Sequence, residues 1–300
     1  MRTSLALLLL QLVACASASR PASSPTSSSP SASTSRSPLA LTYLGVAGWQ
    51  LEGDEVTVLA DPYFSRPDLD QPISPDLEAI ARHAPARADV IVIGHTHVDH
   101  VLDAPEVAKR TGAQLVGSRS TALYAKAAGL PDDQIIPVKG GEDYAFERFS
   151  VRVIPSLHSA LDHKHTIGGE LTQPPTLPMK MDDFAEGGTF AYLVRLAGHE
   201  VIVLSTANFI ERELEGLRPD IAIVGVGLRQ EIHDYSCRLM RVLGYPEVVL
   251  ATHFDDWQSP PPTGEVPRSP DLEAFVAEIQ RCSPKTRVIV PRHFERMTLP

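Results

Sequence analysis

The sequence contains only three cysteines among 300 residues, and they lack the close spacing of a cysteine-based zinc site. It has no cluster of lysine and arginine, and its formal net charge is −10. A net acidic chain without a basic groove is a poor partner for a phosphate backbone, which argues against nucleic acid as a partner. The Ser-x-x-Lys and Gly-x-Ser-x-Gly patterns are also missing, so a covalent serine mechanism has little support.

The N-terminal 14 residues have the features of an export signal. Met1-Arg2 is a short basic start, and the apolar run Leu5–Val13 is too short to span a bilayer. We therefore interpret residues 1–14 as a signal peptide. The end of this segment, Leu12-Val13-Ala14-Cys15, resembles the lipobox of bacterial lipoproteins, which implies lipidation of Cys15. The alternative is an ordinary signal peptide cut after Ala16 or Ala18, which would give a secreted protein.

A tether is expected to follow. Residues 15–38 consist almost entirely of Ser, Pro, Ala, Thr and Arg, and such a segment cannot bury apolar surface. We expect it to be disordered and to join a lipid anchor in the membrane to one folded domain at residues 39–300. Because Ala16 rather than Asp follows the lipobox cysteine, the resemblance implies the outer membrane or periplasm. Cys237 and Cys282 would then lie in an oxidising compartment, either paired or as two buried thiols.

The hydrophobic pattern of residues 39–300 predicts an α/β (α+β) domain. Strands are expected at Leu39–Leu44 and Glu55–Leu59, joined by a Gly-containing turn, and the β-branched run Asp89–Ile93 predicts a buried strand. A helix is expected over Asp76–His83, with Ser74 as N-cap and Pro75 as its first residue. Mixed strands precede helix–strand units in two passes, which suits a four-layer αββα sandwich.

Three later segments carry further expectations. Helices are expected at Phe209–Leu217 and Ile232–Leu243. Residues 159–188 show no clear period, and an irregular stretch of that length is usually a functional loop in a compact domain. Its apolar side chains Met179, Met181 and Phe184 could cover an acyl group of a substrate, or the segment could be a plain surface lid.

The strongest signal for chemistry is Gly94-His95-Thr96-His97-Val98-Asp99-His100. Three imidazoles and one carboxylate occur within six positions, directly after the predicted buried strand. Imidazole and carboxylate are preferred zinc ligands, and loops at the ends of buried strands are where sites usually lie. The spacing and its context therefore predict a metal site.

His95-x-His97-x-Asp99-His100 resembles the HxHxDH motif of the metallo-β-lactamase superfamily. The resemblance covers the whole folded part. It implies that His95 and His97, with a third histidine, hold one metal ion, which would be zinc. It also implies that Asp99 and His100, with a final histidine, hold a second ion. The third histidine corresponds to His158 and the final one to His253, each following a predicted strand.

The sequence departs from the family pattern at one ligand. The family has a bridging aspartate after a strand, whereas this chain has Leu204-Ser205-Thr206-Ala207-Asn208. Thr206 stands where the aspartate is expected, and Asn208 could offer a carbonyl oxygen instead. Either one metal dominates, or the second is held more weakly. Asp255 and Asp256 are candidates to compensate, although a solvated loop is the simpler interpretation of both.

Other residues are assigned supporting positions. Asp61, followed by a proline, resembles an aspartate that orients the histidine loop in relatives, and a turn aspartate is an equally good interpretation. His163 and His165 are interpreted as pocket or surface residues. The aromatic residues Trp49, Tyr63, Phe64 and Trp257 either line the pocket or pack in the core.

These features predict a zinc-dependent hydrolase that uses an activated water, with Asp99 holding metal and accepting a proton. The resemblance is strongest to the branch with sugar-phosphate lactonases and N-acyl phosphatidylethanolamine phospholipase D. It implies a phosphodiester or lactone rather than a β-lactam, in a small-molecule or lipid-like substrate. The alternative is a non-catalytic envelope lipoprotein that binds metal or a partner. A flavin-dependent di-iron enzyme would need the carboxylate bridge and a flavin domain, and the sequence shows neither. The oligomeric state is not predicted.

Overall fold

Two seven-stranded sheets form the centre of the domain. The structure is a computed structural model, and it describes residues 36–165, 168–261 and 269–300. The first sheet has the order β14-β1-β2-β3-β4-β5-β6, and the second the order β13-β12-β11-β10-β9-β8-β7. The strands of the first sheet are β1 (Leu39–Gly45), β2 (Gly48–Gly53), β3 (Val56–Ala60), β4 (Val90–Val92), β5 (Gln114–Gly117), β6 (Ile135–Pro137) and β14 (Arg296–Leu299). Those of the second are β7 (Asp143–Ala145), β8 (Phe149–Pro155), β9 (Phe190–Leu196), β10 (His199–Leu204), β11 (Ile221–Gly225), β12 (Val248–Thr252) and β13 (Arg287–Ile289).

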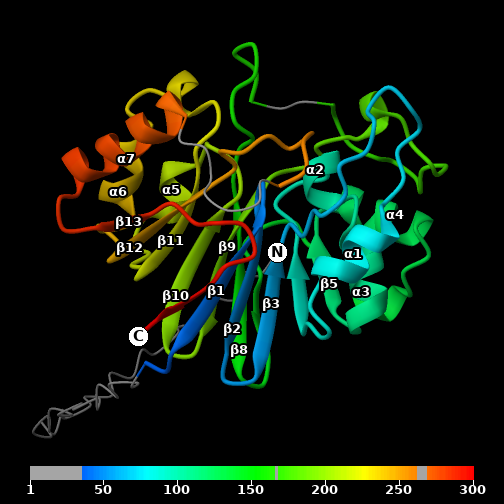
Figure 1. The fold of residues 1–300 in the computed structure, drawn as a ribbon, viewed down its shortest axis with the longest axis horizontal. Coiled ribbons are helices and arrows are strands. Elements are labelled where there is room, and N and C mark those ends of the chain that lie inside the picture. Colours follow the sequence, from blue (N-terminus) through cyan, green and yellow to red (C-terminus); the bar gives the residue numbers. More distant parts are fainter. Residues whose placement is uncertain (1–35, 166–167, 262–268) are drawn as a thin grey trace, which may run out of the picture. The chain divides into compact units, whose positions relative to one another are not determined.

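Helices cover the outer face of each sheet, as Figure 1 shows. The first sheet carries α1 (Leu77–His83), α2 (Val98–Val101), α3 (Ala104–Thr111) and α4 (Arg119–Ala127). The second carries α5 (Glu211–Leu214), α6 (Tyr235–Val242) and α7 (Pro270–Cys282). Three short 3₁₀ helices are η1 (Asp132–Gln134), η2 (Met181–Asp183) and η3 (Arg229–Glu231).

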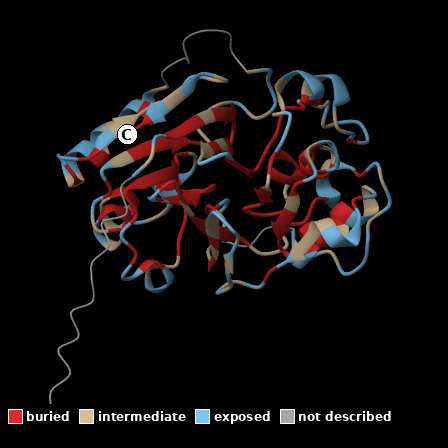
Figure 2. Ribbon diagram, turned by 90° about the horizontal axis from the view of Figure 1, so that it is seen from below, coloured by how far each residue is buried: buried red, intermediate tan, exposed pale blue. Residues whose placement is uncertain are grey.

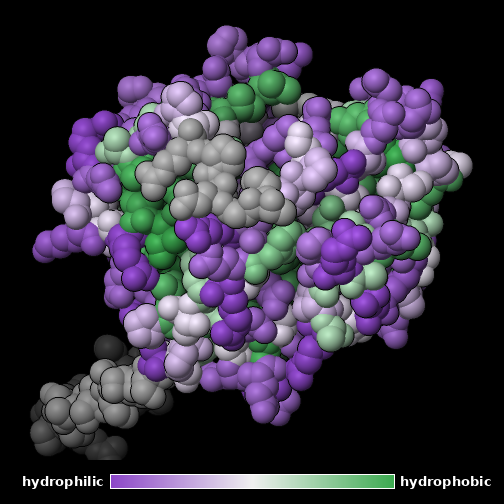
Figure 3. Space-filling view, in the orientation of Figure 1, coloured by the Kyte–Doolittle hydropathy of each residue, from purple (hydrophilic) through white to green (hydrophobic). Residues whose placement is uncertain are grey.

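Three apolar cores separate the four layers. One is built from inward-facing side chains of both sheets, such as Trp49, Val92 and Tyr192. Another joins the first sheet to its helices, and the third joins the second sheet to α5, α6 and α7. The buried residues concentrate in the strands (Figure 2), whereas hydrophilic residues predominate on the face seen in Figure 3. The predicted αββα sandwich is confirmed.

The strand directions bring the candidate ligands to one edge of the sheets. Strands β3, β4, β5 and β6 run parallel to one another, as do β10, β11, β12 and β13. Loops that follow parallel strands emerge at the same edge, which is where sites on such sheets form. The loops after β4, β8 and β12 carry the predicted histidines. Because β1 is parallel to β3 through β2, the chain enters β1 at the opposite edge.

Several predicted elements need correction. The segment between the first two predicted strands is itself a strand, β2, which its flanking glycines concealed. The C-terminal strand β14, which pairs with β1, was also missed. Helix α1 begins at Leu77, because the Asp76 side chain accepts from the N–H groups of Glu78 and Ala79, so the prediction of Ser74 as N-cap was wrong.

Two predicted helices are shorter in the structure. Only Glu211–Leu214 of the expected helix at 209–217 is helical, and the preceding residues form the turn around Asn208. The helix expected from residue 232 begins at Tyr235, after η3.

The predicted signal peptide, Cys15 and most of the tether lie outside the described residues. No helix in the described ranges is both long and apolar enough to cross a membrane. Cys237 and Cys282, left open by the sequence, form a disulfide with a Cα–Cα distance of 5.1 Å. It joins α6 to α7 on the outer face of the second sheet.

Candidate metal centre

The histidine loop is held closely against the second sheet. After β4 the chain passes Gly94 and His95, and α2 begins at Val98 with His97 as its N-cap residue. A Cβ at Gly94 would lie 2.9 Å from Ser205 Oγ and 3.1 Å from Asp61 Oδ2, so only glycine fits there. The Gly94 N–H donates to Asp61 Oδ1 at 2.7 Å, which fixes the start of the loop.

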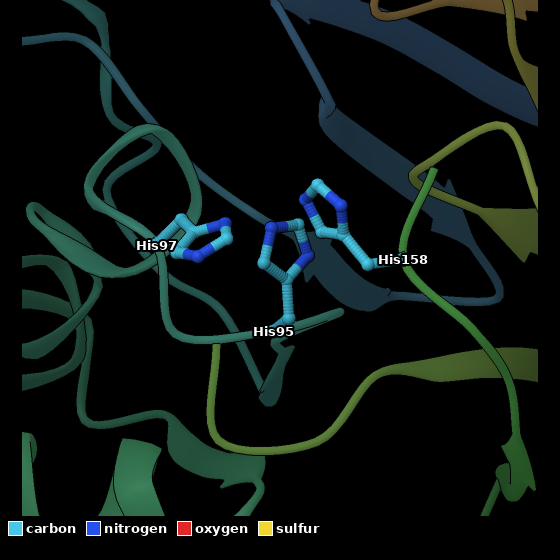
Figure 4. Close-up of side chains that lie close together, drawn as sticks. All are labelled: His95, His97 and His158. Carbon is cyan, nitrogen blue, oxygen red and sulfur yellow. The ribbon is translucent and has the colours of Figure 1, made fainter. Parts of the chain in front are cut away.

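His95, His97 and His158 form the first triad. One ligand nitrogen of each lies within 4.8 Å of those of the other two. The ring centroids are 4.6–4.9 Å apart, and the rings stand nearly perpendicular to one another. Figure 4 shows the three imidazoles converging from two loops that are far apart in sequence. The arrangement brings three imidazole nitrogens to one point, as a bound metal ion requires.

The first triad is electrically suited to a cation. Burial, with the neighbouring His100 and His158, holds the pKa of His95 well below its ordinary value. Burial also lowers the pKa of His158 to about 4, although a hydrogen bond to the Ser159 carbonyl acts in the opposite direction. Both imidazoles are therefore neutral at pH 7, the form that binds metal. Both ring nitrogens of His95 are buried and have no hydrogen-bond partner among the described residues.

His158 is oriented by its own loop. Its Nδ1 lies 2.8 Å from the Ser159 carbonyl oxygen, so Nδ1–H donates and Nε2 is left as the ligand atom. The Asn208 side-chain amide donates to the His158 carbonyl at 2.9 Å, and this fixes the backbone of the loop.

Asp99, His100 and His253 form the second triad, with ligand atoms again within 4.8 Å of one another. Asp99 Oδ2 lies 3.2 Å from His253 Nε2 and 3.5 Å from His100 Nε2. The His100 ring is 3.9 Å from the His95 ring, so the two triads are adjacent. The donor set of nitrogen and oxygen is one that divalent metals such as zinc accept.

The second triad contains an ionised carboxylate and lies beside Asp61. Burial raises the pKa of Asp99, but the charge of His100 and the hydrogen bond from His253 outweigh burial. The net pKa of Asp99 lies below its ordinary value, so the carboxyl is ionised. Burial likewise lowers the pKa of His100, and the charges of Asp99 and Asp61 more than reverse this. Asp61 Oδ2 lies 3.1 Å from His100 Nδ1, which directs His100 Nε2 toward the triad. Asp61 therefore lies beside His100, and its orienting role stays a prediction.

One member of the second triad, His253, and the neighbouring Asp61 have strained backbones. Asp61 and His253 adopt φ values of 40° and 53°, in the left-handed region that is uncommon for residues other than glycine. The His253 N–H donates to the Val46 carbonyl at 2.6 Å, which holds this conformation. Strain of this kind persists where the surrounding structure imposes it, typically at functional sites.

Thr206 and Asn208, predicted to replace the bridging ligand, have neutral side chains with other partners. Thr206 Oγ1 accepts from the Ser159 N–H at 2.9 Å. Asn208 Oδ1 accepts from the Phe209 N–H, and its amide nitrogen lies 3.0 Å from His165 Nδ1. Both residues support the His158 loop. We therefore do not carry forward the predicted role of Thr206 or Asn208 as a replacement for the bridging ligand.

Asp255 has a structural role that the sequence did not reveal. Its carboxylate accepts from Tyr43 Oη at 2.5 Å and from the Val46 N–H at 2.9 Å, and lies 2.7 Å from His293 Nε2. These contacts fix the chain directly after His253, so the interpretation of Asp255 as a solvated loop residue was wrong. Asp256 is exposed and bonds only to its own turn, at Gln258 and Ser259.

The aromatic residues singled out in the sequence pack in the core or against it. Trp49 is fully buried, and its Nε1 donates to Thr252 Oγ1 at 2.9 Å, directly before His253. Trp257 packs against the core beneath the first sheet. Tyr63 is buried with its hydroxyl unpartnered among the described residues. The pKa of Tyr63 is raised, mainly by burial and further by the charge of Asp99. The nearby charge of Arg66 acts in the opposite direction. The only sequence signal for Tyr63 was its place two residues after Asp61.

Where the structure describes the loop at residues 159–188, most of its residues are exposed or half-buried, but several of its apolar side chains pack against the core. Met179 and Phe184 are buried in the core of the first sheet and its helices, which corrects the suggestion that they face an acyl group. His163 is exposed, with Nδ1 3.5 Å from Glu231 Oε2, and His165 contacts Asn208. Neither belongs to a triad.

The fold has two facing sheets covered by helices on their outer faces, and two triads of candidate metal ligands lie at one edge of the sheets. These features are those of a metalloprotein with an αββα fold. Residues 40–253 match a family model described as "Beta-lactamase superfamily domain". A UPF0173 metal-dependent hydrolase from Methanopyrus kandleri is 27% identical over 259 residues, covering 84% of this chain and 96% of its own. Another, from Heliobacterium modesticaldum, is 32% identical over 230 residues, covering 72% of this chain and 83% of its own.

A solved structure supports the same fold. Igni18, described as a novel metallo hydrolase from the archaeon Ignicoccus hospitalis, superposes with a TM-score of 0.60 at 21% identity, covering 88% of this chain and 99% of its own. The chain belongs to the beta-lactamase superfamily and, within it, to the UPF0173 metal-dependent hydrolases. The family and the fold expected from the sequence are both confirmed.

Proposed function

We propose that this metal-dependent hydrolase uses zinc to cleave an ester-type bond, with phosphodiesters and lactones favoured over β-lactams. One observation carries the proposal: two adjacent triads of three ligand atoms each converge at the same edge of the sheets. A site with only incidental histidines would not direct six side chains from three loops toward two points.

Each residue of the two triads has a proposed role in metal binding or proton transfer. His95, His97 and His158 would hold the first ion and His100, His253 and Asp99 the second. When bound, zinc lowers the pKa of water from about 15.7 to about 7 and polarises a carbonyl or phosphoryl oxygen. Asp99 is ionised, so it is available as a ligand and as the acceptor of a proton released in the reaction. Asp61 keeps His100 oriented throughout.

The choice of bond rests on the resemblance of two short segments. Asp61-Pro62 and Thr252-His253-Phe254 are similar to the lactonase and phospholipase D-like branch of the superfamily. Two contacts support roles for these segments at the centre: Asp61 Oδ2 lies 3.1 Å from His100 Nδ1, and Thr252 Oγ1, directly before His253, donates to the Val46 carbonyl. The proposed substrate is a small or lipid-like molecule.

Hydrolysis assays would test the proposal. Zinc-loaded protein is expected to cleave a chromogenic phosphodiester or a lactone, and Asp99→Asn is expected to lower kcat/KM by about 100-fold or more. His163→Ala, which changes an exposed histidine of a neighbouring loop, serves as the matched control and should retain full activity. Bound zinc without cleavage of either substrate class would favour the alternative, a non-catalytic metal-binding lipoprotein.

We further propose that the protein is a lipoprotein of the bacterial cell envelope, anchored through Cys15. The disulfide between Cys237 and Cys282 supports an oxidising compartment. Because the chain enters β1 at the edge opposite the ligand loops, a tether there would leave the metal centre accessible. Cys15→Ser should abolish labelling by a fatty-acid analogue and release the protein from membranes. Continued lipid labelling of this variant would contradict the proposal.

A further inference from the structure

A cavity lies beside α1, and none of the residues of the two triads lines it. It has a volume of about 690 Å³, within the range of small-molecule sites. Its walls come from the loop after β3, from α1, from Pro260 and Pro261, and from the connection between β13 and β14. Figure 1 shows α1 in cyan and that connection in red.

The cavity carries positive charge on an acidic protein. Arg66 and Arg82 both line it, and among the described residues of its lining Asp76 is the only acidic one. Asp76 Oδ1 is engaged by the first N–H groups of α1. Arg82 has no salt-bridge partner in the part of the chain that the structure describes. Since the whole chain has a net charge of −10, this concentration of cations is a local feature that favours an anion.

Two buried nitrogens in the lining are unsatisfied. Arg66 is held by the carbonyls of Tyr63, Ser65 and Ser259, yet its Nη2 has no hydrogen-bond partner among the described residues. The His293 side chain is 1% exposed, and its Nδ1 also lacks a partner there while Nε2 lies against Asp255. Because His293 Nε2–H donates to Asp255, His293 Nδ1 is an acceptor and gives no support to an anion. Buried polar groups are nearly always hydrogen-bonded, so the Arg66 Nη2 donor indicates a missing acceptor.

An aromatic column forms another wall. The His83 ring is stacked between Phe294 at 4.1 Å and Phe64 at 6.2 Å, and all three residues line the cavity. Phe294 has a φ of 60°, which is a genuine outlier for a bulky residue. The chain therefore holds this ring against the column in a strained conformation, as is common at ligand sites.

We infer that this cavity binds a small organic anion with an aromatic ring, the anionic group meeting Arg66 and Arg82 and the ring packing against Phe294. Guanidinium groups pair with planar or tetrahedral oxyanions, and flat rings stack on aromatic side chains. The site is separate from the metal centre, so its ligand would bind whether or not metal is present.

Calorimetric titration with benzenesulfonate tests the inference. The full chain should bind one equivalent saturably. Methanesulfonate, which lacks the ring, and benzyl alcohol, which lacks the charge, should bind at least about tenfold more weakly. Zinc-stripped and zinc-loaded protein should give the same affinity. Absence of saturable binding, equal binding of methanesulfonate or loss of binding on zinc removal would each overturn the proposal.

Two variants assign the binding to this cavity. Arg82 is exposed in the last turn of α1, so Arg82→Gln should fold normally and weaken benzenesulfonate binding about fivefold or more. Arg110→Gln, an exposed arginine in the last turn of α3, is the matched control and should not change the affinity. Phe294→Asn removes the ring at a position where asparagine tolerates the backbone, and should also weaken binding. Equal affinities for Arg82→Gln and Arg110→Gln would contradict the assignment.

Discussion

The two triads at the edge of the sheets are built differently. The first consists of three imidazoles, of which His95 and His158 are held neutral by burial. The second contains the ionised Asp99, depends on Asp61 for the orientation of His100, and takes His253 from a strained backbone position. Thr206, the predicted counterpart of the family's bridging aspartate, carries no charge.

The difference indicates an unequal pair of metal sites. Each triad supplies three ligand atoms, so each is able to hold an ion. Without an anionic bridge, the charge that couples the ions is missing, and the second site also relies on more supporting contacts. We therefore expect the first ion to be bound tightly and the second to dissociate first.

The largest expected effect is that of His95→Ala. This change removes a central ligand of the first triad, so the affinity of the tight site and the hydrolytic rate should each fall by more than about 100-fold, beyond the loss typical of supporting residues. Metal content and initial rates measure the effect, and circular dichroism checks the fold. Unchanged metal and rate would show that the site is assigned to the wrong residues.

Asp61→Asn should weaken the second site more than the first, because the asparagine Oδ1 can still accept from the Gly94 N–H. Loss of the carboxylate removes the group that orients His100, and the affinity for the weaker ion should fall about 10- to 100-fold. Zinc titration in competition with a chromophoric chelator measures both sites in one experiment. The tight site serves as the internal control, and an equal loss at both sites would contradict separate support.

Asp255→Asn tests the support of the loop that carries His253. Although burial raises the pKa of Asp255, hydrogen bonds from His293 and Tyr43 lower it more, to about 2 from an ordinary 3.8. A carboxyl whose pKa is lowered in the folded protein stabilises the fold at pH values above the ordinary pKa. This stabilisation is lost as the pH falls toward 2. Asp255→Asn should therefore lower the free energy of unfolding by about 2 kcal/mol at pH 7. It should also reduce the change in that free energy between pH 4 and pH 2.

Urea unfolding at several pH values measures this cost. Asp256→Asn, at the exposed neighbouring position, is the matched control and should change stability by about 0.5 kcal/mol or less. A pH dependence of the Asp255→Asn variant that matches the original protein would show that this carboxylate is not the group responsible.

The smallest expected effect is a gain. Thr206→Asp would place a carboxylate at the family's bridging position, and the affinity for the second ion should rise about tenfold, which corresponds to about 1.4 kcal/mol. Thr206→Asn is the control, because it changes size and polarity without adding charge. If the two variants bind zinc alike, the correspondence of this turn to the bridging turn is wrong.

The sequence predicted the layers and the candidate ligands that the structure brings together, because both depend on local patterns. Apolar runs of period two mark strands, and histidines that follow such runs mark the edge where a site forms. Strand β2 was missed because glycines flank it, and β14 because its pairing partner, β1, lies at the other end of the chain.

The supporting contacts were less predictable. Asp255 resembles any acidic loop residue in sequence, and only folding brings Tyr43 and His293 to it. The cavity beside α1 draws on three distant segments, so no single motif indicates it.

Metal content per chain, measured by elemental mass spectrometry during stepwise dialysis against a chelator, tests the central claim most directly. The unequal pair predicts about two zinc ions per chain at first, then a stable plateau near one, with the remaining ion lost only at much higher chelator concentration. Loss of both ions in a single step would contradict the inequality of the two triads. A chain that binds no metal even when zinc is supplied would contradict the metal centre itself.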